Sequence, residues 1–258
     1  MEKIFFCNVN YLGNAGDYWA SPLHYYNFSD FEYNHISFVG ENAHEIENSI
    51  FIIGGGGLII TKDNYLNDIL ESILQKNKVI FWGVGSNTAC PPNFEILSHP
   101  NVILSSTRDI HHNLRHEYVP CVSCKHNLFD KTSTNPNGVG ILEHPNYSIN
   151  IDEFPKIQNN DSIDKIVSFI SSKEFLISST YHGVYWSQLL DKKVVYFNDD
   201  GDINSKFFYL KHRVDMCDSS NYKLKLQLCN QTFGLLKESR TINDEFYKKV
   251  FKTLENLR

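Results

Sequence analysis

The chain has 258 residues, which is enough for one large domain or two small ones with buried cores. Its formal net charge is −6, and its lysines and arginines are scattered, which argues against a nucleic-acid-binding protein. No run of about 18 apolar residues is present, and the apolar stretch near the N-terminus is too short for a signal peptide. We therefore expect a cytoplasmic protein whose contact with a membrane, at its inner face, is at most peripheral.

Seven short apolar runs predict strands that are buried on both faces. They cover residues 3–9, 49–54, 78–85, 101–106, 138–142, 174–179 and 193–198. Residues 64–76, 161–173 and 242–257 instead space their apolar side chains with helical periodicity. Because strands and helices alternate along the chain, the sequence predicts an α/β fold with parallel sheets and helices on both faces.

A polar, turn-rich segment at residues 130–138 predicts a linker between two such units. We expect an N-terminal Rossmann-like domain at residues 1–129 and a C-terminal one at residues 130–258. The last helix, at about residues 242–258, carries an apolar stripe opposite several lysines. This pattern predicts docking onto the body of the protein, back across the domain boundary, with a basic helix on a membrane surface as the alternative.

The six cysteines are spread through a chain that can form its own core, which favours reduced thiols over a disulfide framework. Cys121 and Cys124 form a C-x-x-C pair, but no second pair at zinc-ligand spacing accompanies it. We therefore expect both to be reduced, metal-free residues packed after a strand. A redox or metal-binding role is the alternative.

Three glycine-containing loops follow predicted strands, which is where parallel sheets bind their ligands. GNAGDYW spans residues 13–19, GGGGL spans residues 54–58 after the apolar run SIFII, and GVGSN spans residues 83–87. Exposed backbone N–H groups in such loops can bind a phosphate or carboxylate without basic side chains. None of the loops matches the dinucleotide or P-loop fingerprint, so neither a nicotinamide cofactor nor ATP is supported. The alternative is that the glycines only permit tight turns.

Two further strand ends carry side chains suited to chemistry. Ser179, Thr180 and His182 lie where a buried strand passes into an apolar helix, and an imidazole there can donate or accept a proton near neutral pH. A capping or hydrogen-bonded core histidine is the alternative. Arg108 directly follows another strand and could pair with a carboxylate or phosphate, or simply with Asp109.

Taken in order, these segments resemble the polysaccharide pyruvyl transferase family. Its members show N-x-GD after the first strand, a strand running into GGG[GS], a G-[IV]-G loop, S-x-RD, and a late S-x-R-x-H-G motif. The counterparts here are GNAGD (13–17), IIGGGGL (52–58), WGVGS (82–86), SSTRD (105–109) and SSTYHG (178–183). The chain departs from the family at Thr180, where the family has arginine. Lys206 resembles a basic residue that family members carry after the final strand, and we expect it to supply the lost charge.

The resemblance implies two Rossmann-like domains facing a cleft, similar to the glycosyltransferase fold of the B type. It also implies transfer of the enolpyruvyl unit of phosphoenolpyruvate to two hydroxyls of a sugar, which forms a pyruvate ketal and releases phosphate. His182 would be the general acid or base, and Asn14 and Asp17 would position the acceptor. The donor would contact Arg108, Lys206, Gly54, Gly55, Gly56, Gly57, Gly83, Gly85, Ser86, Ser179, Thr180 and Gly183.

No cofactor and no metal are expected, since phosphoenolpyruvate is itself the donor substrate. The acceptor would be a sugar or oligosaccharide of a bacterial-type surface polysaccharide, free or lipid-linked, and the oligomeric state stays open. One alternative is a glycosyltransferase of the same fold that uses a nucleotide sugar, for which Asp199, Asp200 and Asp202 are loosely suggestive. Another is an inactive carbohydrate-binding relative, since Thr180 removes one expected anion contact.

Overall fold

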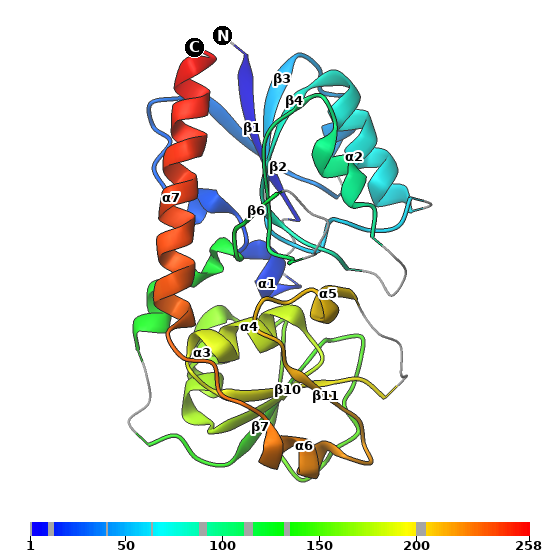
Figure 1. Cartoon of the computed structure of the whole chain (residues 1–258), viewed down its shortest axis with the longest axis vertical. Coiled ribbons are helices and arrows are strands. Elements are labelled where there is room, and N and C mark those ends of the chain that lie inside the picture. The colour runs from blue at the N-terminus through cyan, green and yellow to red at the C-terminus, as the bar shows by residue number, and fades with distance from the viewer. Residues whose placement is uncertain are drawn as a thin grey trace.

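Figure 1 shows two halves stacked along the long axis of the molecule, each built around its own β-sheet. A computed structural model of the chain describes residues 2–9, 13–39, 41–62, 64–87, 92–110, 116–131, 135–199 and 205–258; the side chains of Ser205 and Lys206 lie outside this description. Every strand pair within the two sheets is parallel. The structure is therefore an α/β protein with two parallel sheets, as the alternation of strand and helix patterns predicts.

The first sheet has six strands in the spatial order β2-β1-β3-β4-β5-β6. Its strands are β1 (Lys3–Asn8), β2 (Tyr33–Ser37), β3 (Ser49–Gly54), β4 (Lys78–Val84), β5 (Val102–Thr107) and β6 (Glu117–Tyr118). The helical segments of this half are α1 (Ala15–Tyr18), α2 (Tyr65–Lys76) and the 3₁₀ turns η1 (Pro22–His24), η2 (Ala43–Glu45) and η3 (Phe94–Ser98). The order places a topological switch point between β1 and β3.

Both faces of the first sheet are covered, which explains why its strands are apolar throughout. In β3, Phe51 and Ile53 pack in one cluster with the apolar residues of α2. Ile50 and Ile52 point to the opposite face and pack in another cluster with α7 (Leu235–Asn256). The last helix thus docks on the first sheet, although it begins at Leu235 rather than at about residue 242.

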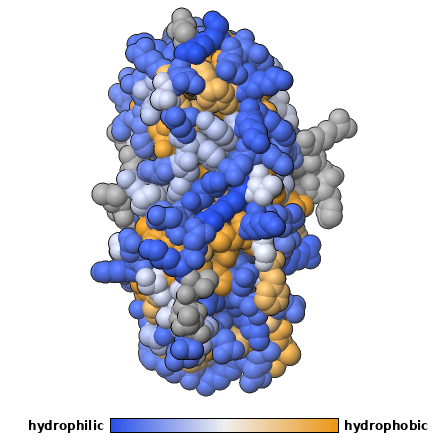
Figure 2. Space-filling model, turned by 90° about the vertical axis from the view of Figure 1, so that its left-hand side faces the viewer, coloured by the Kyte–Doolittle hydropathy of each residue, from blue (hydrophilic) through white to orange (hydrophobic). Residues whose placement is uncertain are grey.

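Figure 2 shows the face of the molecule that carries α7, which is largely hydrophilic with smaller hydrophobic areas in both halves. The buried side of α7 includes Phe246, Val250 and Leu254, while Lys248 and Lys252 are exposed. This division matches a helix docked on the protein body. Within the described residues, no helix is both long enough and apolar enough to cross a bilayer.

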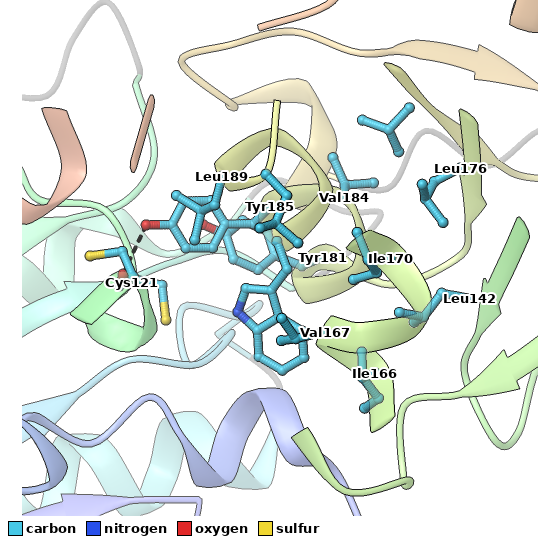
Figure 3. Close-up of a cluster of buried hydrophobic side chains, with 14 of the residues drawn as sticks. Cys121, Leu142, Ile166, Val167, Ile170, Leu176, Tyr181, Val184, Tyr185 and Leu189 are labelled. Carbon is cyan, nitrogen blue, oxygen red and sulfur yellow. Dashed lines mark hydrogen bonds between the residues drawn. The ribbon is translucent and has the colours of Figure 1, made fainter. Parts of the chain in front are cut away.

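The second sheet has five strands in the order β11-β10-β9-β7-β8. Its strands are β7 (Val139–Glu143), β8 (Lys156–Gln158), β9 (Phe175–Ser178), β10 (Lys193–Phe197) and β11 (Asp215–Cys217), and its helices are α3 (Ile163–Ser172), α4 (Tyr181–Leu189), α5 (Ser205–Phe208) and α6 (Tyr222–Leu228). Helices α3 and α4 pack on one face, as Figure 3 shows, and Leu226 of α6 packs on the other. The switch point here lies between β7 and β9.

The change from one core to the other occurs before the predicted linker. Val119 packs with the first sheet, whereas Cys121, Cys124 and Phe129 pack with α3 and α4 of the second half. The latter three belong to the 3₁₀ turns η4 (Val122–Lys125) and η5 (Asn127–Asp130) or directly precede them. The packing therefore changes from the first core to the second near residue 120, and the domain boundary at residue 130 stays a prediction.

All seven predicted strands are confirmed, with ends that shift by at most one residue. The strands that the apolar-run criterion misses are β2, β6, β8 and β11, which are the two outer strands of each sheet. Within the described residues each has a neighbour on one side only. All four are short, and three of them (YNHIS, EY and KIQ) are largely polar. An edge strand is not buried on both faces, so it carries no continuous apolar run.

Candidate functional site

The carboxyl ends of the strands at the two switch points meet across a cavity of about 220 Å³. The first half lines it with residues that include Asn14, Asp17, Gly57, Asn87 and Arg108. The second half contributes His144, Asn159, Thr180, Tyr181 and His182. A separate hollow of about 270 Å³ lies between α2 and η3, and no predicted site residue lines it. We therefore place the candidate site in the cavity between the halves.

Arg108 directly follows β5 and places its guanidinium group deep in this cavity wall. Its side chain is 3 % exposed, and its Cζ lies 3.5 Å from the centroid of the Tyr181 ring. Gly85 leaves room for it, since a Cβ on that residue would lie 2.2 Å from Nε of Arg108. Both Nε and Nη1 are buried and have no hydrogen-bond partner in the described part of the chain. A buried cation without such partners costs several kcal/mol, so the arrangement favours binding of an anion.

Asp109, the next residue, is a buried carboxyl group that supports the same loop. Its Oδ2 accepts a hydrogen bond from the backbone N–H of Ser86 at 2.5 Å. Burial raises the pKa of Asp109 to about 6, even though the Arg108 guanidinium and the Ser86 N–H group act in the opposite direction. Asp109 therefore partly offsets the charge of Arg108 at neutral pH and ceases to do so in mild acid.

We expect the stability of the wild-type protein to fall relative to that of Asp109→Asn as pH rises from about 4 to about 6. The pKa of Asp109 is raised in the folded state, so this carboxyl group favours folding most below its unfolded pKa, and the contribution is lost as pH approaches about 6. The difference should amount to at most about 3 kcal/mol, on top of a pH-independent offset from the changed surroundings of Arg108. Urea denaturation of both proteins across this pH range measures it, and parallel stability curves would contradict the raised pKa.

His182 lies in the first turn of α4, where the sequence fixes its position closely. Thr180 caps this helix, because its Oγ1 accepts a hydrogen bond from the backbone N–H of Gly183 at 2.9 Å. Gly183 lets the helix start approach β9, since a Cβ there would lie 2.1 Å from Oγ of Ser178. The His182 ring is 4 % exposed, with Nε2 at 3.4 Å from Sγ of Cys121. On its other side, a Cβ on Gly16 would lie 1.9 Å from Nδ1 of the ring.

Helix α1 links the two halves at the edge of the cavity. Asn14 caps α1 and donates a hydrogen bond from its Nδ2 to Asp17 Oδ2 at 2.7 Å. From the second half, Nδ2 of Asn159 donates to Oδ1 of Asn14 at 2.6 Å, and the backbone carbonyl oxygen of Asn159 accepts from the N–H of Ala15 at 2.9 Å. The predicted acceptor residues Asn14 and Asp17 therefore line the cavity, and Asn14 also joins the halves.

The predicted role of the glycines as backbone donors to a ligand needs correction. The N–H groups of Gly55, Gly83, Gly85 and Ser86 donate within the protein, to Trp82 O, Ser106 Oγ, Gly56 O and Asp109 Oδ2, respectively. The N–H of Gly183 caps α4 as described above. A Cβ on Gly55 would lie 2.2 Å from Cβ of Ala20, and one on Gly54 would lie 2.6 Å from Cδ of Pro22. These glycines let neighbouring chain segments approach, and Gly57 is the one predicted glycine that lines the cavity.

Three other predicted residues have different placements. Ser179 does not line the cavity; its Oγ accepts from the N–H of His144 at 3.0 Å and holds the loop after β7. Thr180 lines the cavity and also serves as the cap of α4. Lys206 lies in α5, and its side chain is outside the described part of the structure. Among described residues, no group of three or more His, Cys, Asp or Glu side chains is arranged to hold a metal ion.

Sequence reasoning missed residues that contribute to this site. Asn87, His144, Asn159 and Tyr181 line the cavity, and Cys121 contacts the imidazole of His182. His144 and Tyr181 could have been predicted from the sequence, because His144 directly follows β7 and Tyr181 begins the helix after β9, the two strands of the second switch point. Asn159 and Cys121 lie outside the predicted strand-end loops, and their contacts depend on how the halves pack.

Comparison with known proteins bears on the fold. No protein-family model matches this chain, and neither does any curated protein. The solved structure of a functionally uncharacterized protein from Klebsiella pneumoniae subsp. pneumoniae NTUH-K2044 is similar, with a TM-score of 0.51 and 16 % sequence identity, over 80 % of this chain and 86 % of that chain. At this identity the likeness concerns the fold alone. The chain thus shares its mixed α/β architecture with that protein.

Proposed function

We propose that this protein is a pyruvyltransferase that moves the enolpyruvyl unit of phosphoenolpyruvate onto two hydroxyls of a sugar. The acceptor is a surface polysaccharide or its precursor, free or lipid-linked, and the product is a pyruvate ketal. In this proposal the two halves form a cleft like that of B-type glycosyltransferases. The observation that carries the proposal is the buried Arg108 guanidinium, with two N–H-bearing nitrogens lacking partners among described residues, in the same small cavity as His182.

The chemistry suits these two side chains. Phosphoenolpyruvate carries a carboxylate and a phosphate, and a planar guanidinium can bind either one with two hydrogen bonds. In the reaction a proton adds to the enol CH₂ carbon, while one sugar oxygen bonds to the neighbouring carbon. The second sugar oxygen then displaces phosphate from that carbon. His182 would give the proton to the CH₂ carbon and later take one from an attacking hydroxyl, so it is restored at the end of the cycle. The proton of the other hydroxyl leaves with the departing phosphate.

The size of the cavity favours this donor over a nucleotide sugar. Its volume of about 220 Å³ is below the roughly 300–1,000 Å³ that is typical of sites for drug-sized ligands. A small dianion or trianion fits this space better than a nucleoside diphosphate joined to a sugar. Of the acids that loosely suggest a nucleotide-sugar site, Asp199 accepts hydrogen bonds from Ser219, and Asp200 and Asp202 lie outside the described residues.

We expect Arg108→Ala to weaken phosphoenolpyruvate binding by about ten- to a hundredfold. Removing a charge-assisted contact should cost about 1.5 to 3 kcal/mol of binding free energy. Arg108→Lys keeps the charge but loses the planar fork and the stacking on Tyr181, so it should restore only part of the affinity. Isothermal titration calorimetry with phosphoenolpyruvate measures these differences.

Lys192→Met is the matched control, because Lys192 is also a buried cation but donates to the carbonyl oxygen of Ser171 at 2.8 Å and does not line the cavity. It should leave donor affinity unchanged. Incubation with phosphoenolpyruvate and candidate sugars, followed by a phosphate assay, tests turnover. If the wild type binds no phosphoenolpyruvate but releases nucleotide from a nucleotide sugar, the glycosyltransferase alternative replaces the proposal. Glycan binding without any turnover would favour an inactive carbohydrate-binding protein.

A further inference from the structure

Helix α4 packs against the C-x-x-C segment, residues 121–124. His182, Tyr185 and Trp186 are spaced i, i+3 and i+4, so they lie on one face of that helix. The hydroxyl of Tyr185 donates to the carbonyl oxygen of Cys121 at 2.9 Å, a contact drawn in Figure 3, and Nε1 of Trp186 donates to Ser123 Oγ at 3.0 Å. Together with the His182–Cys121 contact, all three side chains hold the segment between Cys121 and Cys124.

Buried polar groups connect Ser123, through Cys121, to the imidazole of His182. Oγ of Ser123 lies 3.2 Å from Sγ of Cys121, which in turn lies 3.4 Å from Nε2 of His182. Cys121 and Ser123 are both 0 % exposed, so water does not compete for these bonds. The indole N–H can only donate, so Ser123 Oγ accepts from Trp186, and its own hydroxyl proton can point to the sulfur. Which of the two groups donates in the 3.4 Å contact depends on the tautomer of the ring. An imidazole N–H is a stronger donor than a thiol, which favours the sulfur as the acceptor from Nε2.

The sulfur remains an uncharged partner of the ring. Burial raises the pKa of the Cys121 thiol, although hydrogen bonds from Ser123 and the charge of Arg108 act in the opposite direction. A neutral thiol orients the ring by its hydrogen bond, whereas a thiolate would also form an ion pair with the protonated imidazole. The geometry therefore suits a group that fixes which ring nitrogen exchanges a proton.

We propose that Cys121 is a positioning residue whose sulfur accepts a hydrogen bond from Nε2–H of His182 and thereby assigns proton exchange with the substrate to Nδ1. This inference rests on the proposed function. The protonated imidazole gives its Nδ1 proton to the enol CH₂ carbon and becomes the neutral form that still carries the proton on Nε2. Nδ1 then takes the proton of an attacking sugar hydroxyl, which regenerates the starting state. The sulfur neither gains nor loses a proton in this sequence.

The test compares Cys121→Ala and Cys121→Ser with Cys124→Ala. Cys124 is the matched control because it belongs to the same segment and is equally buried, but its Sγ accepts from Nδ2 of Asn243 at 3.6 Å. We expect Cys121→Ala to reduce kcat by up to about 10²-fold with little change in KM for phosphoenolpyruvate, since a misdirected ring affects proton transfer more than donor binding. The pH profile of kcat should shift in this variant. Cys121→Ser should retain most of the activity, because a hydroxyl also accepts from Nε2.

A second readout does not depend on turnover. Nitrogen-15 NMR of labelled protein, with the His182 signals assigned by their loss in His182→Asn, reports which ring nitrogen carries the proton. We expect the Nε2–H form in the wild type, Cys121→Ser and Cys124→Ala, and a mixture in Cys121→Ala. The NMR measurement tests the role of Cys121 even if phosphoenolpyruvate proves not to be the donor. The Nδ1–H form in the wild type, an unchanged tautomer in Cys121→Ala, or equal losses in Cys121→Ala and Cys124→Ala would overturn it. If Cys121→Ala does not fold, the wild-type tautomer and Cys121→Ser decide.

Discussion

Replacement of His182 by asparagine should reduce turnover by about 10²- to 10⁴-fold while the protein stays folded, because a positioned general acid contributes an effect of this size. The substitution leaves the Thr180 cap of α4 in place, since that cap uses the backbone N–H of Gly183. Affinity for phosphoenolpyruvate should change little, because the proposed anion contact belongs to Arg108. Phosphate release and calorimetric titration of the same preparation measure the two effects separately.

The alternative for His182 is a core histidine that only supports packing, and the same experiment distinguishes it. If His182 only supported packing, its replacement would reduce thermal stability and leave the rate per folded molecule unchanged. A folded His182→Asn protein that turns over at the wild-type rate would therefore remove His182 from the chemistry. Circular dichroism and a thermal melt establish how much of each preparation is folded.

Gly16→Ala should strongly reduce turnover although it adds a single methyl group. A Cβ at this position would lie 1.9 Å from Nδ1 of His182, and the Gly16 backbone does not need positive φ, so the effect is steric rather than conformational. Either the ring or α1 must move, and a displacement of about 1 Å at a reacting group can reduce the rate by about 10²-fold. Overpacking should also cost about 1 to 3 kcal/mol of stability.

Gly140→Ala is the matched control for this substitution. Its Cβ would also be crowded, at 2.8 Å from side-chain atoms of Lys173 and Phe169, but it lies in β7 and its nearest neighbours do not include His182. We expect both variants to lose stability, as measured by urea denaturation, and only Gly16→Ala to lose turnover. Equal turnover in the two variants would show that contact between α1 and the imidazole is unimportant for the reaction.

The strands were predictable from the sequence because burial on both faces requires an apolar residue at nearly every position. In β3, Ile50 and Phe51 face opposite sides of the sheet and are both fully covered, one by α7 and the other by α2. The edge strands β2, β6, β8 and β11 lack this signal. The two-sheet α/β architecture could therefore be derived, while the width of each sheet could not.

The candidate site was predictable where it depends on strand ends and not where it depends on packing between the halves. Asn14 and Asp17 follow β1, Arg108 follows β5 and His182 follows β9, so all four lie beyond the carboxyl ends of parallel strands, where ligands bind. The contact of Asn159 with Asn14 arises only when one half packs against the other. The glycines were misinterpreted for a similar reason, because a glycine pattern shows that something comes close and does not show whether it is a ligand or another chain segment.

The position of α7 has a consequence for how this protein acquires its structure. One face of the first sheet is covered by Phe246, Val250 and Leu254, which are translated after both sheets. During synthesis, α7 therefore cannot pack against Ile50, Ile52 and Trp82 until the ribosome has translated the second half. Contacts between such distant parts of a chain form late and slow the folding of a protein. The first half consequently cannot mature as an independent unit on the ribosome, and residues 1–129 expressed alone would expose an apolar sheet face and tend to aggregate.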